Sequence, residues 1–124
     1  MRILIAEDQE DNRDILVRRL ERKGHELHEA KNGAEAVAIA ESVAPDLILM
    51  DVSMPIMSGI EATRALKSQA GTAHIPVIVL TAHALPSVRD ECVSAGCDGF
   101  ATKPLDFPAL LSTIDAVIAA RARA

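Results

Sequence analysis

The chain has 124 residues, of which 49% are hydrophobic and 25% are charged, and its formal net charge at pH 7 is −5. This length predicts one domain over residues 1–124 and is too short for two. The acidic balance without a basic block argues against direct binding of nucleic acid, and the apolar runs are far shorter than the roughly 20 residues of a membrane-spanning helix, which argues against a membrane.

Strand and helix signals alternate five times along the chain. In chain order, the sequence predicts a strand over residues 2–6, a helix over 11–23, a strand over 25–30, a helix over 33–43, a strand over 47–50, a helix over 59–70, a strand over 76–80, a helix over 86–95, a strand over 99–102 and a helix from 107 to the end. The third strand is continuously apolar, which is typical of a strand covered on both faces. The second is more polar and indicates a sheet edge.

The helix boundaries carry their own signals. Residues that commonly begin or end helices stand at most of them: Asn32 with Glu35, Ser58 with Glu61, Pro86, Asp106, Gly24 and Gly96. Five β-α units of this length predict an α/β fold with a doubly wound, five-stranded parallel sheet and five helices, which is flavodoxin-like. In the strand order 2-1-3-4-5, the switch point where ligands bind falls between the first and third strands.

Chemically distinctive residues follow four of the predicted strands. Glu7 and Asp8 come after the first strand and Asp51 after the third. Thr81 follows the fourth strand and Lys103 the fifth. An open parallel sheet brings these ends to one crevice, so we expect the five side chains to share a site. Three carboxylates suit Mg²⁺, and a hydroxyl and an ammonium suit the oxygen atoms of a phosphoryl group.

Each of these residues has a simpler interpretation when it is taken alone. Glu7 and Asp8 would then be solvated acids near a helix N-terminus. Thr81 would be an ordinary β-branched strand residue and Lys103 an exposed lysine. Asp51 is harder to explain in this way, because a carboxylate at the end of a buried strand is unfavourable without a partner. The joint occurrence favours a shared site.

Four segments resemble those of one protein family. They are IAEDQ, LILMDVSMPIMSG, IPVIVLTAHA and GFATKP, in that order. Together, over essentially the whole chain, they resemble the receiver domain of bacterial two-component response regulators, the CheY-like family. The resemblance implies a phosphoacceptor regulator of a two-component system or phosphorelay, which assists its own phosphorylation and dephosphorylation but is not an enzyme.

The resemblance implies a role for each site residue. Asp51 would accept a phosphoryl group from a phosphohistidine on a sensor histidine kinase or a histidine phosphotransfer protein. Thr81 and Lys103 would contact the phosphoryl oxygens. The ligands of Mg²⁺ would be Asp51, Glu7, Asp8 and the backbone carbonyl of Ser53.

The same resemblance implies how the signal leaves the site. Phe100 stands where many receivers have a switch tyrosine, and a phosphoryl group that draws Thr81 inward would let the ring repack. The surface expected to change and to bind a downstream protein comprises the fourth helix, the fifth strand and the last helix, which are Pro86–Ala95, residues 99–101 and residues 107–119.

Three further positions follow from the resemblance. The Lys103–Pro104 peptide bond is expected to be cis. Ser53 and His83 occupy two variable positions that, in this family, tune the lifetime of the aspartyl phosphate.

Two other functions fit this sheet topology less well. An aspartyl-phosphate hydrolase normally has a second acid two residues after its nucleophile, and that position is Ser53. A flavodoxin-like flavin carrier would need a Ser/Thr-rich phosphate loop after the first strand and aromatic residues around the ring. This chain has acids in that place and only two Phe.

The organisation and location of the protein are also expectations. We expect a stand-alone single-domain regulator, with a receiver excised from a hybrid histidine kinase as the alternative. The start at Arg2 without a leader predicts a cytoplasmic protein, in which Cys92 and Cys97 stay reduced. His25 and His28 should point to opposite faces of their strand and cannot share a metal.

Overall fold

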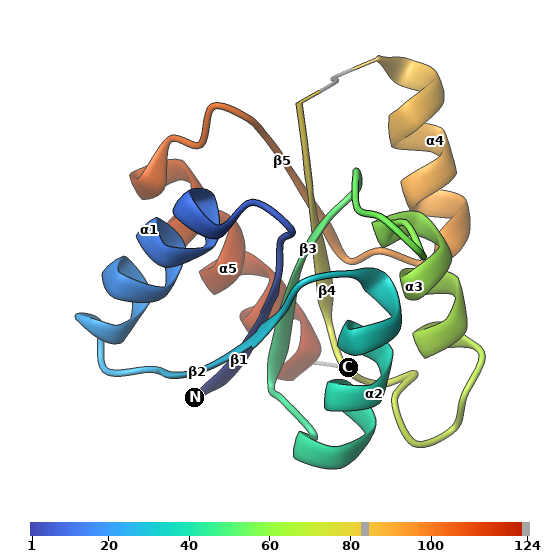
Figure 1. Ribbon diagram of the computed structural model, residues 1–124, viewed down its shortest axis with the longest axis horizontal. Helices are drawn as coiled ribbons and strands as arrows, with labels where there is room; N and C mark the ends of the chain where they lie inside the picture. Colours follow the sequence, from blue (N-terminus) through green and yellow to red (C-terminus); the bar gives the residue numbers. More distant parts are fainter. Residues whose placement is uncertain (83–84, 123–124) are drawn as a thin grey trace.

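The computed structural model describes residues 1–82 and 85–122. Five parallel strands form one sheet in the order β2-β1-β3-β4-β5 (Figure 1), so the predicted fold class and strand order are confirmed. The strands are β1 (Arg2–Ala6), β2 (Glu26–Ala30), β3 (Leu47–Asp51), β4 (Val77–Thr81) and β5 (Gly99–Thr102). The helices are α1 (Glu10–Glu21), α2 (Gly33–Val43), α3 (Gly59–Lys67), α4 (Pro86–Ala95) and α5 (Phe107–Ala122). No helix in these ranges has the length and apolarity needed to span a membrane.

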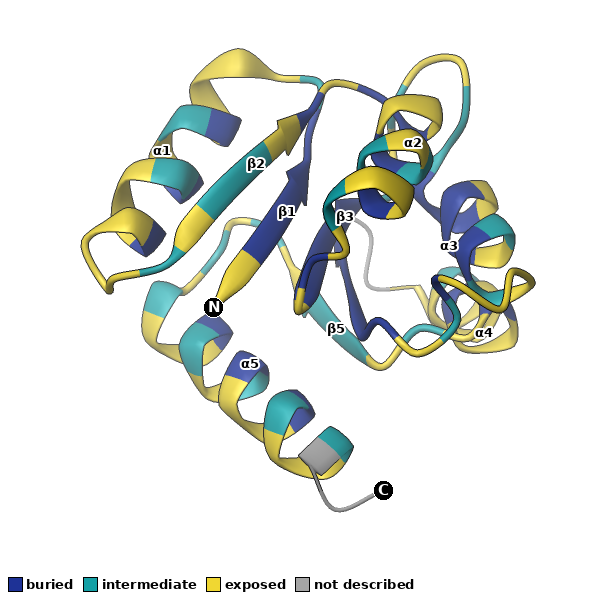
Figure 2. Ribbon diagram, turned by 90° about the horizontal axis from the view of Figure 1, so that it is seen from below, coloured by how far each residue is buried: buried dark blue, intermediate teal, exposed yellow. Residues whose placement is uncertain are grey.

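Helices cover both faces of the sheet, with α1 and α5 on one face and α2, α3 and α4 on the other (Figure 1). Because side chains alternate along a strand, Ile3 and Ile5 pack with α1 and α5, whereas Leu4 and Ala6 pack with the helices of the opposite face. Every residue of β3 and β4 is buried, as Figure 2 shows for the centre of the sheet. This explains why these two strands are apolar at consecutive positions.

Two of the predicted helix starts are confirmed by their hydrogen bonds. Asn32 Oδ1 accepts a bond from the N–H of Glu35 at 2.8 Å, and Ser58 and Glu61 form a complete capping box. Glu35 differs in one detail, because its carboxylate accepts from the N–H of Lys31 and not from that of Asn32. These caps fix where α2 and α3 begin.

Some predicted boundaries were wrong by one to three residues. The third helix ends at Lys67 and not at Ala70. The reason is local competition, because the hydroxyl of Thr72 donates to the carbonyl of Leu66 at 2.7 Å and so takes an acceptor that another helical turn would use. The first helix and the second strand are likewise slightly shorter than predicted, whereas the fourth strand extends to Thr81.

Candidate functional site

Three carboxylates converge at the carboxyl ends of β1 and β3. Glu7 directly follows β1, Asp8 is the next residue, and Asp51 is the last residue of β3. β1 and β3 are parallel neighbours, so both strands end at the same edge of the sheet. One carboxylate oxygen from each acid lies within 4.8 Å of the other two.

Lys103 brings a positive charge to these acids from the segment after β5. Its Nζ lies 2.7 Å from Glu7 Oε1 and 3.3 Å from Asp51 Oδ1. Its backbone N–H donates to the carbonyl of Thr81 at 2.7 Å, and its peptide bond to Pro104 is cis, as predicted. Lys103 is therefore fixed through both its backbone and its side chain, and its closer ion pair is with Glu7.

The pKa values of the two inner acids, Glu7 and Asp51, are shifted in opposite directions. Glu7 is fully buried and Asp51 is 5% exposed. Burial, followed by the hydrogen bond and the charge of Glu7, raises the pKa of Asp51 to about 7. Burial also acts to raise the pKa of Glu7, but its hydrogen bonds with Lys103 and Asp51 outweigh burial and lower it. Without a metal ion, Asp51 is therefore harder to ionise than Glu7.

The pKa values of Asp8 and Lys103 are also shifted, in part by the charges around them. Burial and then the hydrogen bond and charge of Glu7 raise the pKa of Asp8. Burial acts to lower the pKa of Lys103. The hydrogen bond of Lys103 with Glu7 and the negative charges of Asp51 and Glu7 outweigh burial and raise this pKa above the ordinary value. Three acids share one ammonium, so the site has an excess of negative charge that a divalent cation would offset. An all-oxygen donor set of this kind fits Mg²⁺.

Two more predicted residues lie at the same edge of the sheet. Thr81 ends β4 and is 2% exposed, and β4 pairs directly with β3. Ser53 is exposed and lies two residues after Asp51, in the loop between β3 and α3 (residues 52–58, the β3–α3 loop). His83 lies outside the described residues.

Arg13 was not recognised from the sequence. Its side chain is buried, and its Nη1 donates to the carbonyl of Glu7 while its Nε donates to Glu29 Oε1, both at 2.9 Å. Arg13 thereby holds the backbone that carries Glu7. A signal was available, because Arg13 stands at helical spacing from Leu16 and Leu20 on the buried stripe of α1.

Two glycines allow the β3–α3 loop to lie close to its neighbours. A Cβ atom at Gly59 would collide with the carbonyl oxygen of Asp51, and one at Gly33 would collide with that of Met57. The N–H of Gly59 donates to Val52 at 2.9 Å, and the N–H of Gly33 donates to Met57 at 3.0 Å. Both ends of the loop are therefore held in place.

The environment of the site is partly apolar. A cavity of about 530 Å³ opens beside Glu7 and Lys103 and is lined on its other sides by residues that include Ile15 and Phe107.

In β5, Phe100 is half-buried, and the guanidinium of Arg89 from α4 lies 5.6 Å from the centre of its ring. This cation–π contact was not predicted.

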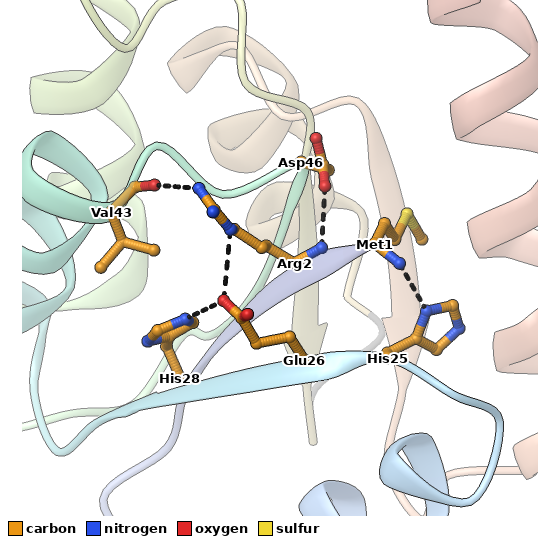
Figure 3. Close-up of polar contacts among 7 residues, drawn as sticks. All are labelled: Met1, Arg2, His25, Glu26, His28, Val43 and Asp46. Atoms are coloured by element: carbon orange, nitrogen blue, oxygen red, sulfur yellow. Dashed lines mark hydrogen bonds and ion pairs between the residues drawn. The ribbon is translucent and has the colours of Figure 1, made fainter.

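Figure 3 shows His25, which precedes β2, and His28, in the middle of β2, each beside a different partner. His25 Nδ1 accepts from the amino group of Met1 at 3.2 Å, whereas His28 Nε2 lies 2.7 Å from Glu26 Oε2. The two rings have separate partners and take no part in the acidic cluster.

Residues 3–115 match the response regulator receiver domain family. The chain belongs to this family. Receiver domains are phosphoacceptor signalling domains, which receive phosphate from histidine kinases and regulate downstream targets, and they are not enzymes in the usual sense.

Curated relatives agree with this assignment over most of their length. The protein PilH of Pseudomonas aeruginosa is 40% identical over 118 residues, which are 95% of this chain and 98% of PilH. The polar-differentiation response regulator DivK of Brucella anthropi is 38% identical over 112 residues, which are 90% of this chain and 91% of DivK.

Solved receiver structures have the same fold. The receiver domain of the sensor histidine kinase PA1611 from Pseudomonas aeruginosa has a TM-score of 0.88 and 32% identity, covering 95% of this chain and 97% of that one. The chemotaxis protein CheY4 of Vibrio cholerae has a TM-score of 0.88 and 31% identity, covering 94% and 97% of the two chains.

Proposed function

We propose that Asp51 of this receiver domain accepts a phosphoryl group from a phosphohistidine of a sensor histidine kinase or a histidine phosphotransfer protein. The observation that carries the proposal is the convergence of Glu7, Asp8 and Asp51 around the ammonium of Lys103 at the carboxyl edge of the sheet. No structural role explains this arrangement well, because three clustered acids with one cation repel each other.

Different residues of the chain have different roles in the transfer. A deprotonated Asp51 oxygen attacks phosphorus as the bond between phosphorus and the imidazole nitrogen breaks, and that nitrogen regains its ring lone pair. The Lys103 ammonium, already within 3.3 Å of Asp51, stabilises negative charge on the phosphoryl oxygens in the loose transition state. The Thr81 hydroxyl donates to another of these oxygens. Arg13 keeps Glu7 in position through its backbone carbonyl.

Glu7, Asp8, Asp51 and the carbonyl of Ser53 would hold Mg²⁺. When bound, the ion would neutralise the acids and polarise the phosphoryl oxygens. The receiver domain of PA1611, which is 32% identical, has a magnesium ion coordinated in its active-site cleft, and this supports the same assignment here.

The test is phosphorylation by acetyl phosphate followed by mass spectrometry. With Mg²⁺, we expect one added phosphoryl group on the peptide that contains Asp51, and none with EDTA or in Asp51→Asn. Fast release of phosphate from small substrates without a stable adduct would favour an aspartyl-phosphate hydrolase, and a modification elsewhere would reject Asp51.

We also propose that phosphorylation acts through Thr81 and Phe100 on a downstream protein that binds the face formed by α4, β5 and α5. The cation–π contact between Arg89 and Phe100 supports this path, since repacking of the ring would change how α4 meets β5. Thr81→Ala should still accept a phosphoryl group but lose most of the chemical-shift change on this face when beryllofluoride is added. Changes confined to residues near Asp51 in the wild type would contradict the path.

The proposal also covers the domain organisation of the protein, its location and the loss of its phosphoryl group. We propose that residues 1–124 form one receiver unit that acts as a stand-alone regulator in the cytoplasm, where the free thiols of Cys92 and Cys97 stay reduced. We further propose that the site assists loss of its own phosphoryl group, which the decay of the phosphorylated protein with and without EDTA would test.

A further inference from the structure

The β3–α3 loop has a strained apex. Ile56 has a φ of 69°, and the N–H of Met57 donates to the carbonyl of Pro55 at 2.7 Å across it. A three-residue turn with this bond and a positive central φ is rare and strained, and the strain is greater for a β-branched side chain. The other non-glycine residue with a positive φ among those described, Ala44, ends α2, where this conformation is common.

The side chain of Ile56 is not buried in the protein, so burial of this side chain does not offset the strain of the backbone. It is 84% exposed, the highest exposure among the large hydrophobic side chains of the described residues. Its neighbours Met54 and Met57 pack against the core, and the carbonyl of Met57 is held by Gly33. The fold thus fixes the loop on both sides of Ile56 and projects an apolar side chain into solvent at its apex. Strained residues of this kind concentrate at functional sites.

Ile56 lies within reach of any protein that binds over Asp51. Five residues span at most about 17 Å when extended, and the bond from Gly59 to Val52 folds this loop back on itself. A protein partner covers roughly 800 Å² of surface, which corresponds to a disc with a radius of roughly 16 Å. A macromolecular donor centred on Asp51 therefore covers Ile56, whereas a small phosphoryl donor does not.

We propose that Ile56 is a contact residue for the phosphohistidine protein that phosphorylates Asp51, and that it packs against apolar side chains around that histidine. This inference rests on the proposed function. The apolar, uncharged apex selects for a donor with an apolar rim beside its phosphohistidine. The strained turn presents Ile56 in one orientation, so little conformational freedom is lost on binding.

Three variants separate apolar contact from backbone strain. Ile56→Asn removes the apolar surface and tolerates a positive φ. Ile56→Leu keeps the apolar surface without the β-branch, and Ile56→Val keeps both the β-branch and most of the surface. The protein donor is the histidine kinase or phosphotransfer protein of the source organism that phosphorylates the wild-type chain fastest, and the small donor is phosphoramidate with Mg²⁺.

We expect Ile56→Asn to lower kcat/KM for the protein donor about tenfold, with Leu and Val within about threefold of wild type, as for an apolar contact near an interface centre. Phosphoramidate should phosphorylate all four proteins at the same rate, and the melting temperature of Ile56→Asn should not fall. Normal transfer to Ile56→Asn, an equal loss with phosphoramidate, or a lower melting temperature would overturn the inference.

One other result would overturn it while leaving the proposed function intact. That result is a dimer of the wild-type chain that Ile56→Asn converts to a monomer, since Ile56 would then contact a second copy. Failure of phosphoramidate itself to modify Asp51 would reject the proposed function.

Discussion

The two ends of β1 carry charged clusters that differ in burial and in charge balance. At its start, Arg2 lies beside Glu26 at 3.2 Å, Glu26 also contacts His28, and the N–H of Arg2 donates to Asp46 (Figure 3). The side chains of Arg2 and Glu26 are 55% and 58% exposed. At the other end of the same strand, Glu7 is fully buried in a cluster of three acids and one ammonium.

The difference in burial gives the two clusters different electrostatic properties. At the exposed edge, water screens each charge and opposite signs are interleaved, so removing one partner changes little. At the buried edge, desolvation strengthens every interaction, and burial, followed by the hydrogen bond and the charge of Glu7, raises the pKa of Asp51 to about 7. The clustered acids lower the stability of the protein there and favour the binding of a cation.

Removal of the single ammonium should have the largest effect. Lys103→Met leaves fully buried Glu7 and nearly buried Asp51 without their cation, and breaking even one such pair costs roughly 3–5 kcal/mol. We expect urea unfolding in EDTA to show this loss. A stability equal to that of the wild type would mean that the ion pairs with Lys103 contribute nothing in the folded protein.

Removal of Asp51 or Asp8 should stabilise the protein, in contrast to removal of the ammonium. In EDTA, Asp51→Asn should raise the free energy of unfolding by an amount on the order of 4 kcal/mol at pH 8, since the pKa of Asp51 rises from 3.8 to about 7 on folding. Asp8→Asn should act in the same direction with a smaller effect, and added Mg²⁺ should reduce both gains.

Glu7→Gln is the matched control for that experiment. Folding lowers the pKa of Glu7, so the ionised carboxylate of Glu7 stabilises the protein near neutral pH. Replacing it by the neutral amide of Gln should therefore not raise stability. Equal gains from Glu7→Gln and Asp51→Asn would show that the acids are equivalent and would contradict the distinction between them.

The pH dependence isolates the contribution of Asp51. Between about pH 4 and pH 7 the unfolded chain has lost the proton that folded Asp51 keeps, so this group stabilises the protein below that window and the contribution is lost as the pH rises through it. The difference in unfolding free energy between wild type and Asp51→Asn, measured by urea titration in EDTA, should therefore grow with pH across this window. A constant difference would place the pKa of folded Asp51 near its ordinary value.

The smallest effect is expected at the exposed edge. Glu26→Gln removes the carboxylate that contacts both Arg2 and His28, yet its melting temperature should be indistinguishable from that of the wild type. The lowered pKa of Glu26, caused first by its hydrogen bond with His28, does not alter this expectation because the group is exposed. A change as large as that of Asp51→Asn would show that burial is not what separates the two clusters.

Much of the fold and of the site was predictable from particular residues. The caps at Asn32 and Ser58 set the starts of two helices, and the apolar runs before Asp51 and Thr81 set the central strands. The length of α3 was mispredicted because the Thr72 hydroxyl competes for the carbonyl of Leu66, six residues earlier. The spacing of apolar residues along a helix does not predict such a hydrogen bond.

The sequence by itself determined the order of strands and helices, the sheet topology and the set of acids that meet at one edge. These follow from local patterns of apolar residues and from the geometry of parallel sheets, which hold for any chain with such patterns. Only the tertiary structure decided that Lys103 pairs more closely with Glu7 than with Asp51, that Arg13 is buried behind Glu7, and that Ile56 is strained and exposed. These features depend on distances between segments far apart in the chain and on how much water each group loses, and both quantities exist only once the chain has packed.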